Sequence, residues 1–134
     1  PLEHRQLVDS MFEAIGYICW VEEEALIDAV IAVSGSGPAY FFLVLEAMQK
    51  IAQELGLPKQ TAEGLCLHTA LGASRMAIES GVTAADLRKQ VTSPGGTTQA
   101  AINSFQQQGL EDMFRQAMTS AVDRAQTMSK DFSS

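Results

Sequence analysis

The sequence has few of the residues that bind metals or form disulfides. It contains two cysteines and two histidines in 134 residues. Cys19 and Cys66 stand far apart along the chain, and so do His4 and His68. A zinc site usually needs several such ligands at short spacings, and a disulfide framework needs more cysteines than these. We therefore expect no metal site, and a reducing, cytoplasmic setting is the simplest one.

Positive charge is also scarce. Nine Lys and Arg stand against sixteen Asp and Glu, which gives a formal net charge of −7. So acidic a surface repels phosphate backbones and argues against nucleic-acid binding. No uninterrupted apolar run approaches the roughly 18 residues of a membrane span, and the amino end does not have the pattern of a signal peptide. We expect neither a nucleic-acid nor a membrane partner.

Most of the chain has the pattern of amphipathic helices. Hydrophobic residues make up 46% of the sequence and charged residues 19%, which is typical of a globular domain. Apolar positions recur with a helical period. We predict helices over residues 3–15, 24–33, 38–55, 59–80, 84–90, 98–107 and 110–128, the fifth capped by Thr83, and a frayed tail over 130–134.

Residues 17–21 break this pattern, because Tyr-Ile-Cys-Trp-Val is short and rich in aromatic and β-branched residues. We predict a strand here. A lone strand is not stable, since its backbone groups need a partner. Residues 1–22 are therefore expected to be the last helix and strand of a preceding domain, and residues 23–134 an all-α domain.

The helices predicted over 38–55 and 59–80 are apolar on more than one face. A small bundle cannot bury two such helices, and a second copy of the chain is the simplest cover. The predicted fold class is all-α: a helical bundle that forms an intertwined homodimer.

The most informative motif is residues 91–98, Val-Thr-Ser-Pro-Gly-Gly-Thr-Thr. Gly95 and Gly96 allow close approach of a ligand to the backbone. They lead into a helix start, where free N–H groups favour an anion, and Thr97 and Thr98 add hydroxyls. The alternative is a proline-glycine turn with threonine N-caps.

Other candidates have simpler alternatives. Residues 34–38, Ser-Gly-Ser-Gly-Pro, could face a ligand, but Tyr40 stands where a dinucleotide fingerprint needs glycine, so a tight helix-helix passage with serine caps is favoured. The triplet of residues 22–24, all Glu, is either an acid/base site or a solvated helix N-terminus. His68 is either a hydrogen-bonded core histidine or a catalyst, and the methionines are interpreted as core filler.

Residues 28–30 leading to 34–40, together with residues 91–98, closely resemble the carboxy-terminal half of pyrroline-5-carboxylate reductase. The Gly56-Leu57-Pro58 and Gly72-Ala73 segments between them also fit, so the resemblance covers nearly the whole chain. The motif of residues 91–98 is quite specific to that family, whereas a bare Ser-Gly-Ser-Gly is not.

The resemblance implies an enzyme of proline biosynthesis that reduces 1-pyrroline-5-carboxylate to L-proline with NADPH or NADH. In that family a Rossmann domain binds the cofactor and precedes a helical dimerisation domain, and the active site lies between the two subunits. Residues 1–22 would then be a remnant of the NAD(P)-binding domain, and residues 23–134 the dimerisation and substrate-binding domain. The chain would be a carboxy-terminal fragment that is inactive alone.

The resemblance also implies roles for particular residues. Thr98 matches the threonine that hydrogen-bonds the imine nitrogen. The N–H groups of Gly96, Thr97 and Thr98, with the Ser93 hydroxyl, match the cradle for the substrate carboxylate. Residues 34–38 would border the nicotinamide end of the site. Gly81 stands where some members have a glutamate, so that role does not transfer.

Two other functions stay open at this point. One is a helical interaction module without chemistry, and the other is a related reductase acting on another imine or on a keto acid. The residue that selects between NADPH and NADH belongs to the preceding domain.

Overall fold

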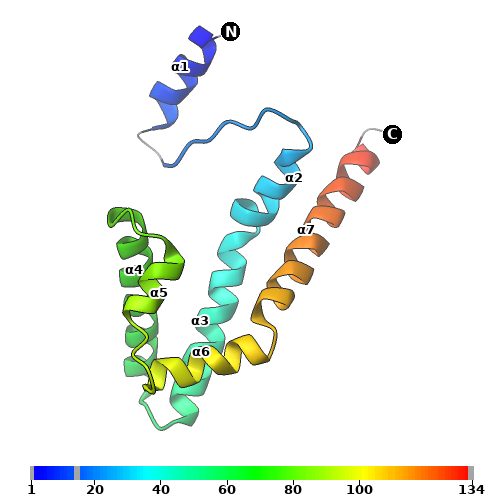
Figure 1. Cartoon of the computed structure of the whole chain (residues 1–134). Helices are drawn as coiled ribbons and strands as arrows, with labels where there is room; N and C mark the ends of the chain where they lie inside the picture. Colours follow the sequence, from blue (N-terminus) through cyan, green and yellow to red (C-terminus); the bar gives the residue numbers. More distant parts are fainter. Residues whose placement is uncertain (1, 14–15, 133–134) are drawn as a thin grey trace.

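The computed structural model describes residues 2–13 and 16–132, and these are mostly helical, with no strand among them (Figure 1). The elements are α1 (Leu2–Phe12), α2 (Leu26–Val30), the π-helical turn η1 (Ile31–Gly35), α3 (Gly37–Glu54), α4 (Lys59–Glu79), α5 (Ala84–Gln90), α6 (Thr97–Gln107) and α7 (Leu110–Phe132). The predicted all-α fold class is confirmed.

The strand predicted over residues 17–21 is wrong, because no other described segment offers it a backbone ladder. This irregular segment is instead attached to α1 by one side chain. The Trp20 indole N–H donates to Asp9 Oδ1 at 2.8 Å, and the Arg5 guanidinium lies 5.0 Å from the centre of the Trp20 ring. The predicted first helix ends at Phe12, while Ala14 and Ile15 lie outside the described residues.

The break predicted at residues 34–38 is also wrong, because the helical path continues through η1 from α2 into α3 (Figure 1). Pro38 has no N–H and cannot donate to the carbonyl four residues back, that of Ser34. A wider turn is found there: the Ser36 N–H donates to the Ile31 carbonyl at 2.8 Å. The serines do not act as caps, since the Ser34 hydroxyl donates to the Val30 carbonyl at 2.9 Å and Ser36 makes no side-chain capping bond.

The other helix boundaries follow the sequence pattern closely. α3 ends before Gly56, whose φ of +101° is a conformation that favours glycine. The N–H of Leu57 then donates to the Ala52 carbonyl at 3.1 Å and closes the helix end. At the other end of the chain, α7 continues to Phe132. The tail predicted to fray from Lys130 is therefore helical to that residue, and Ser133 and Ser134 lie outside the described residues.

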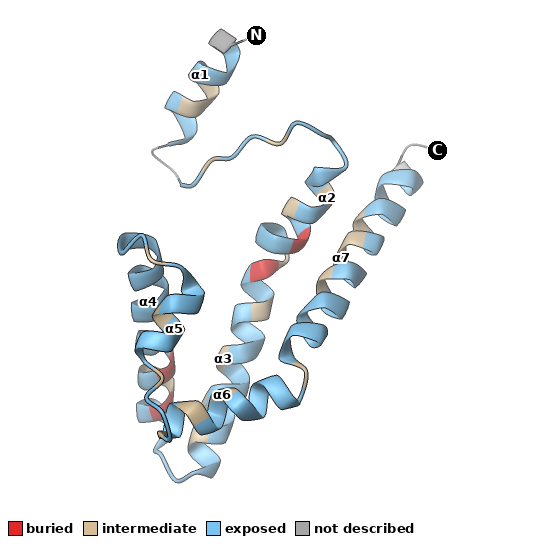
Figure 2. Ribbon diagram, in the orientation of Figure 1, coloured by how far each residue is buried: buried red, intermediate tan, exposed pale blue. Residues whose placement is uncertain are grey.

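The central path of α2, η1 and α3 has α4 packed along α3 and α7 packed along η1 and α2 (Figure 1). This open arrangement buries very little. Among the described residues the buried hydrophobic side chains are those of Ala32, Ala62 and Cys66, and Figure 2 shows how sparse the buried positions are. A single chain therefore has no hydrophobic core of the size that a stable domain needs.

Large apolar side chains are exposed on several helices. Phe41 and Phe42 of α3 are each 68% exposed, and Leu71 of α4 is 64% exposed. The helical path over residues 26–54 is long and apolar enough to cross a membrane by length and composition, with 11% of its most apolar window buried. Exposed apolar side chains also lie on α4, α6 and α7, which a membrane around residues 26–54 would leave uncovered. A protein surface that contacts all of these helices accounts for them better.

We predict that the protein sediments as a homodimer at micromolar concentration. Burying the apolar faces of α3 and α4 against a second copy supplies the core that one chain lacks. Analytical ultracentrifugation gives the mass directly, and a monomeric mass with intact helical circular dichroism would contradict the prediction.

Candidate functional site

The motif of residues 91–98 forms a tight turn that leads directly into α6. The Gly96 N–H donates to the Ser93 carbonyl at 3.0 Å, and Gly95 has a φ of +72°. Proline second and a positive-φ glycine third are the pattern of a type II turn. A Cβ added at Gly96 would lie 3.1 Å from the Ser93 carbonyl oxygen. The positive φ of Gly95 thus favours glycine, and a side chain at Gly96 would require the Ser93 carbonyl to shift slightly.

The turn leads directly into α6, and the first backbone N–H groups of this helix have no partner among the described residues. Gly96 is the N-cap residue and no side chain caps the helix. The N–H groups of Thr97, Thr98 and Gln99 donate no hydrogen bond within the described part of the chain, and the helix dipole points its positive end to the same place. This is the local arrangement in which helix N-termini bind anions.

Three hydroxyls stand beside these donors. Ser93, Thr97 and Thr98 are exposed, and no hydrogen bond within residues 2–13 and 16–132 uses their side chains. The alternative of threonine N-caps is therefore not observed. The Gly96 N–H, predicted as part of the carboxylate cradle, already closes the turn. The donors free to bind a ligand are those of Thr97, Thr98 and Gln99.

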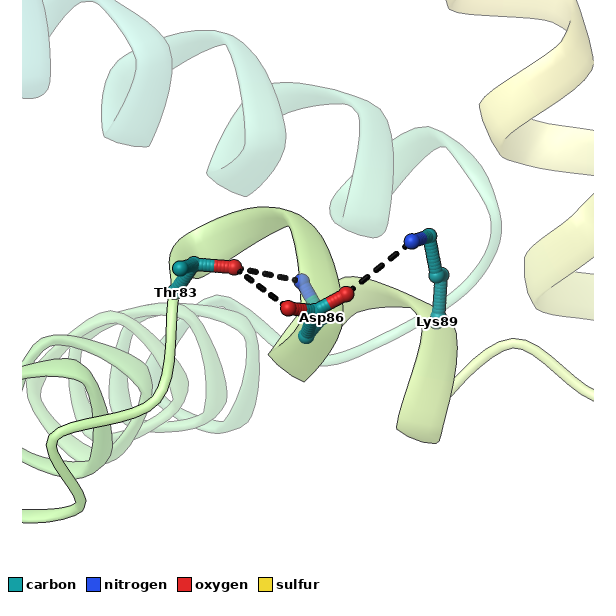
Figure 3. Close-up of polar contacts among 3 residues, drawn as sticks. All are labelled: Thr83, Asp86 and Lys89. Atoms are coloured by element: carbon teal, nitrogen blue, oxygen red, sulfur yellow. Dashed lines mark hydrogen bonds and ion pairs between the residues drawn. The ribbon is translucent and has the colours of Figure 1, made fainter.

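Helix α5 supports the start of this loop. The Thr83 hydroxyl caps α5 by accepting from the Asp86 N–H at 3.2 Å and donates to Asp86 Oδ2 at 2.8 Å. Lys89 Nζ donates to Asp86 Oδ1 at 2.9 Å, and Figure 3 shows the three side chains together. At the other end of α5, the Thr92 hydroxyl donates to the Arg88 carbonyl at 2.5 Å. The loop is thereby attached to the last turn of a well-capped helix.

The electrostatics around the loop are locally positive. Arg88 and Lys89 of α5 line a hollow of about 220 Å³ together with Thr92 and Gln99. Lys89 first, and then the Thr83 hydroxyl, lower the pKa of Asp86 from its ordinary value of 3.8. The Asp86 carboxylate is therefore ionised at neutral pH and is already bound to Lys89, whereas Arg88 makes no ion pair within the described residues.

The other predicted site residues are not brought to this loop. Residues 34–38 lie in η1 and at the start of α3, and no extensive contact joins η1 to α6 among the described residues. The three glutamates at 22–24 are exposed ahead of α2, as a solvated helix N-terminus would be. His68 is exposed on α4, and its side chain makes no hydrogen bond to any residue that the structure describes, so the interpretation as a core histidine is wrong for the single chain.

Two further expectations concern metals and methionines. No group of three or more potential metal ligands occurs among the described residues. Five methionines are exposed and are not core filler within one chain, since the chain has almost no core: Met11, Met48, Met76, Met113 and Met128.

We predict that replacing Thr83 by Ala lowers the free energy of unfolding by about 1 kcal/mol, the usual value of an N-cap. Thr61→Ala is the matched control and should be near neutral, because Thr61 is an exposed threonine of α4 whose side chain bonds to none of the described residues. Denaturant unfolding at one fixed protein concentration makes the comparison. Equal effects of the two substitutions would contradict the assigned cap.

The same contacts predict how Asp86 titrates. Because the pKa of Asp86 is lowered in the folded protein, the contacts of its carboxylate stabilise α5 at pH values above the ordinary pKa of 3.8. This stabilisation is lost as the pH falls through the lowered pKa. Lys89→Met should raise the pKa of Asp86 more than Thr83→Ala does. Carboxyl chemical shifts followed by NMR against pH measure both, and an Asp86 pKa unmoved by Lys89→Met would contradict the ion pair.

Comparison with known proteins identifies the family. The family model described as pyrroline-5-carboxylate reductase dimerisation matches residues 24–128. The chain is 53% identical over 115 residues to the pyrroline-5-carboxylate reductase of Pseudomonas aeruginosa, covering 86% of this chain and 42% of that protein. It is 44% identical to the enzyme of the same name from Pasteurella multocida over 131 residues, covering 97% and 48%.

Solved structures agree with these relatives. A pyrroline-5-carboxylate reductase from Coxiella burnetii has a TM-score of 0.90 at 46% identity, over 93% of this chain and 46% of that one. The Plasmodium falciparum pyrroline carboxylate reductase with NADP bound has a TM-score of 0.82 at 27% identity, over 92% and 47%. This chain thus spans about half the length of the relatives it matches. Since the family model covers most of the helical region, the chain belongs to the pyrroline-5-carboxylate reductase dimerisation family.

Proposed function

We propose that this chain is the carboxy-terminal, dimerising half of an enzyme that reduces 1-pyrroline-5-carboxylate to L-proline. The observation that carries the proposal is the start of α6, where free N–H groups and unpartnered hydroxyls of Ser93, Thr97 and Thr98 lie together. The substrate has a carboxylate and a ring nitrogen a few bonds apart. One compact set of donors can therefore bind both groups.

The cofactor is assigned to a preceding domain. We propose that residues 1–22 belong to that NAD(P)-binding domain and that residues 23–134 form the dimerisation and substrate-binding domain. The chain contains no G-x-G-x-x-G fingerprint. The Plasmodium relative is described with NADP bound, which supports a nicotinamide cofactor, and either NADPH or NADH fits this half of the enzyme.

Substrate binding is assigned to residues 93–98. The N–H groups of Thr97 and Thr98 and the Ser93 hydroxyl hold the carboxylate, and the Gly96 N–H contributes if its bond to the Ser93 carbonyl is shared. The Thr98 hydroxyl is the proposed catalytic group and hydrogen-bonds the ring nitrogen. Binding at both ends of the substrate fixes which face of the imine carbon is open to reduction.

A bound nicotinamide cofactor would supply a hydride to the imine carbon. The C=N π-electron pair would move to the ring nitrogen, which takes up from water the protons that make it a protonated amine. Thr98 stabilises the nitrogen through this change in charge, because a positioned donor or acceptor costs no reorganisation at the moment of reaction. The enzyme is proposed to act in the cytoplasm as a homodimer or higher oligomer, where the free, exposed thiol of Cys19 would stay reduced.

The chain alone is expected to show no reductase activity. It has the substrate loop but no dinucleotide fingerprint, so NADPH oxidation with the imine should require the complete protein. Absorbance at the nicotinamide band follows the reaction for both. Turnover by the 134-residue chain alone would contradict this division of labour, and a complete protein inactive on the imine would contradict the proposed reaction itself.

In the complete enzyme, Thr98→Ala should lower kcat/KM by about tenfold to a thousandfold, the range for loss of one positioned donor. Thr97→Ala is the matched control, because the neighbouring threonine is expected to act through a backbone N–H that the substitution retains. Steady-state kinetics and thermal melts on both variants make the test. Near-normal turnover of the Thr98 variant with an unchanged melt would show that its hydroxyl has no role in the reaction.

A further inference from the structure

Arg88 of α5 is a cation without a partner beside the proposed substrate loop. Its guanidinium makes no ion pair and no hydrogen bond with the residues that the structure describes. The neighbouring cation is already used, since Lys89 Nζ donates to Asp86 Oδ1 at 2.9 Å. The backbone of Arg88 is attached to the loop, because its carbonyl accepts from the Thr92 hydroxyl at 2.5 Å. A substitution of the Arg88 side chain keeps that bond, so it changes the charge and leaves the attachment of the loop intact.

The Arg88 side chain lines a hollow of about 220 Å³ that adjoins both ends of the proposed substrate turn. Thr92, which also lines the hollow, directly precedes Ser93. Gln99 is a third lining residue and directly follows Thr98. The N–H of Gln99 is one of the three free donors at the start of α6. The positive charge of Arg88 therefore lies beside the donors to which the substrate carboxylate is assigned.

The acidic side chains near Arg88 have another cation to bind. Arg88 also borders a second hollow, which contains Glu111 and Asp112 at the start of α7. Arg115 Nη2 donates to Glu111 Oε1 at 2.8 Å, and Arg115 Nε lies 3.5 Å from Asp112 Oδ1. Arg115 thus partly neutralises both carboxylates. Because neither carboxylate bonds to Arg88, the Arg88 guanidinium is left to interact with an anion from outside the chain.

We infer that Arg88 makes the site selective for rings that carry a carboxylate over uncharged rings of the same shape. This inference rests on the proposed function, in which the substrate is 1-pyrroline-5-carboxylate. Backbone N–H groups donate equally to a carboxylate or to a neutral carbonyl oxygen. A guanidinium distinguishes the two, because its attraction depends on the net charge of the ligand and extends beyond hydrogen-bond distance. The N–H groups of Thr97 and Thr98 thus set where the carboxylate lies, and Arg88 sets the preference for a charged ring.

The test compares two unreactive rings as ligands of the complete protein: cyclopentanecarboxylate, which is negatively charged, and cyclopentanecarboxamide, its neutral counterpart. Isothermal titration calorimetry measures both affinities, and their ratio is the preference for the carboxylate. Arg88→Gln should weaken binding of the carboxylate by about twofold to fivefold, the value of an exposed charge interaction. Binding of the amide should stay near its wild-type value, because the amide has no net charge for Arg88 to attract.

Two control variants and a salt series complete the test. Arg88→Lys keeps the charge and should retain most of the wild-type preference. Lys50→Gln removes one positive charge from α3, where Lys50 is exposed and does not line the hollow, and should leave the preference unchanged. The Debye length falls from about 10 Å at 0.1 M salt to about 3 Å at 1 M. High salt should therefore reduce the wild-type preference toward that of Arg88→Gln, an effect that a merely structural role of Arg88 does not predict.

Two results for Arg88→Gln would overturn the inference: an unchanged preference, and an equal loss of affinity for both rings, which a structural role of Arg88 predicts. An equal effect of Lys50→Gln would show that the net charge of the protein acts and Arg88 has no special part. A wild-type protein that binds the carboxylate no better than the amide would also contradict the inference. Neither ligand reacts, so a wild-type protein inactive on 1-pyrroline-5-carboxylate would contradict the proposed function and leave these affinities interpretable.

Discussion

The need to cover apolar surface determines the rest of this structure. Helices α3 and α4 pair along one side and leave side chains such as Phe41, Phe42 and Leu71 in water. Three buried hydrophobic residues among those that the structure describes cannot offset the conformational entropy lost on folding. We therefore expect association to be part of folding, so that the stability of the domain would depend on protein concentration.

The π-helical turn η1 allows a long apolar helical path to continue past Pro38. Pro38 would interrupt a regular α-helix, because it lacks a donor and its ring crowds the preceding turn. The Ser36 N–H reaches the Ile31 carbonyl in the wider ring, and the Ser34 hydroxyl satisfies the Val30 carbonyl. The apolar faces of α2 and α3 thus form one surface instead of two short ones.

The sequence predicts the helices well where local chemistry decides the outcome. Thr83 caps α5 as predicted, and Gly56, with its positive φ, follows the end of α3 at the position where a glycine is favoured. Prediction from the sequence fails where the local structure depends on a partner segment. Residues 17–21 have strand-forming side chains but no ladder among the described residues, and Ser-Gly-Ser-Gly-Pro has turn-forming composition but lies in a continuous helix. His68 has the apolar neighbours of a core residue, yet the surface that would bury it is absent from one chain.

The candidate site follows the same rule. Pro94 and Gly95 predict the turn, and the following helix start predicts free donors, because both depend only on neighbouring residues. The motif does not predict that the Gly96 N–H closes the turn, because the same residues would also allow this N–H to face a ligand.

The proposed site raises an electrostatic question, namely how a chain of net charge −7 would attract the carboxylate of the proposed substrate. The acidic side chains act at long range, where salt screens them over a Debye length of about 8 Å at physiological ionic strength. The N–H groups of Thr97 and Thr98 act at hydrogen-bond distance, and Arg88 and Lys89 line the adjoining hollow. Lys89 is already bound to Asp86, whereas Arg88 makes no ion pair among the described residues. At the proposed site, short-range donors and the Arg88 guanidinium would outweigh the distant carboxylates, and closure of the site against water would strengthen them further.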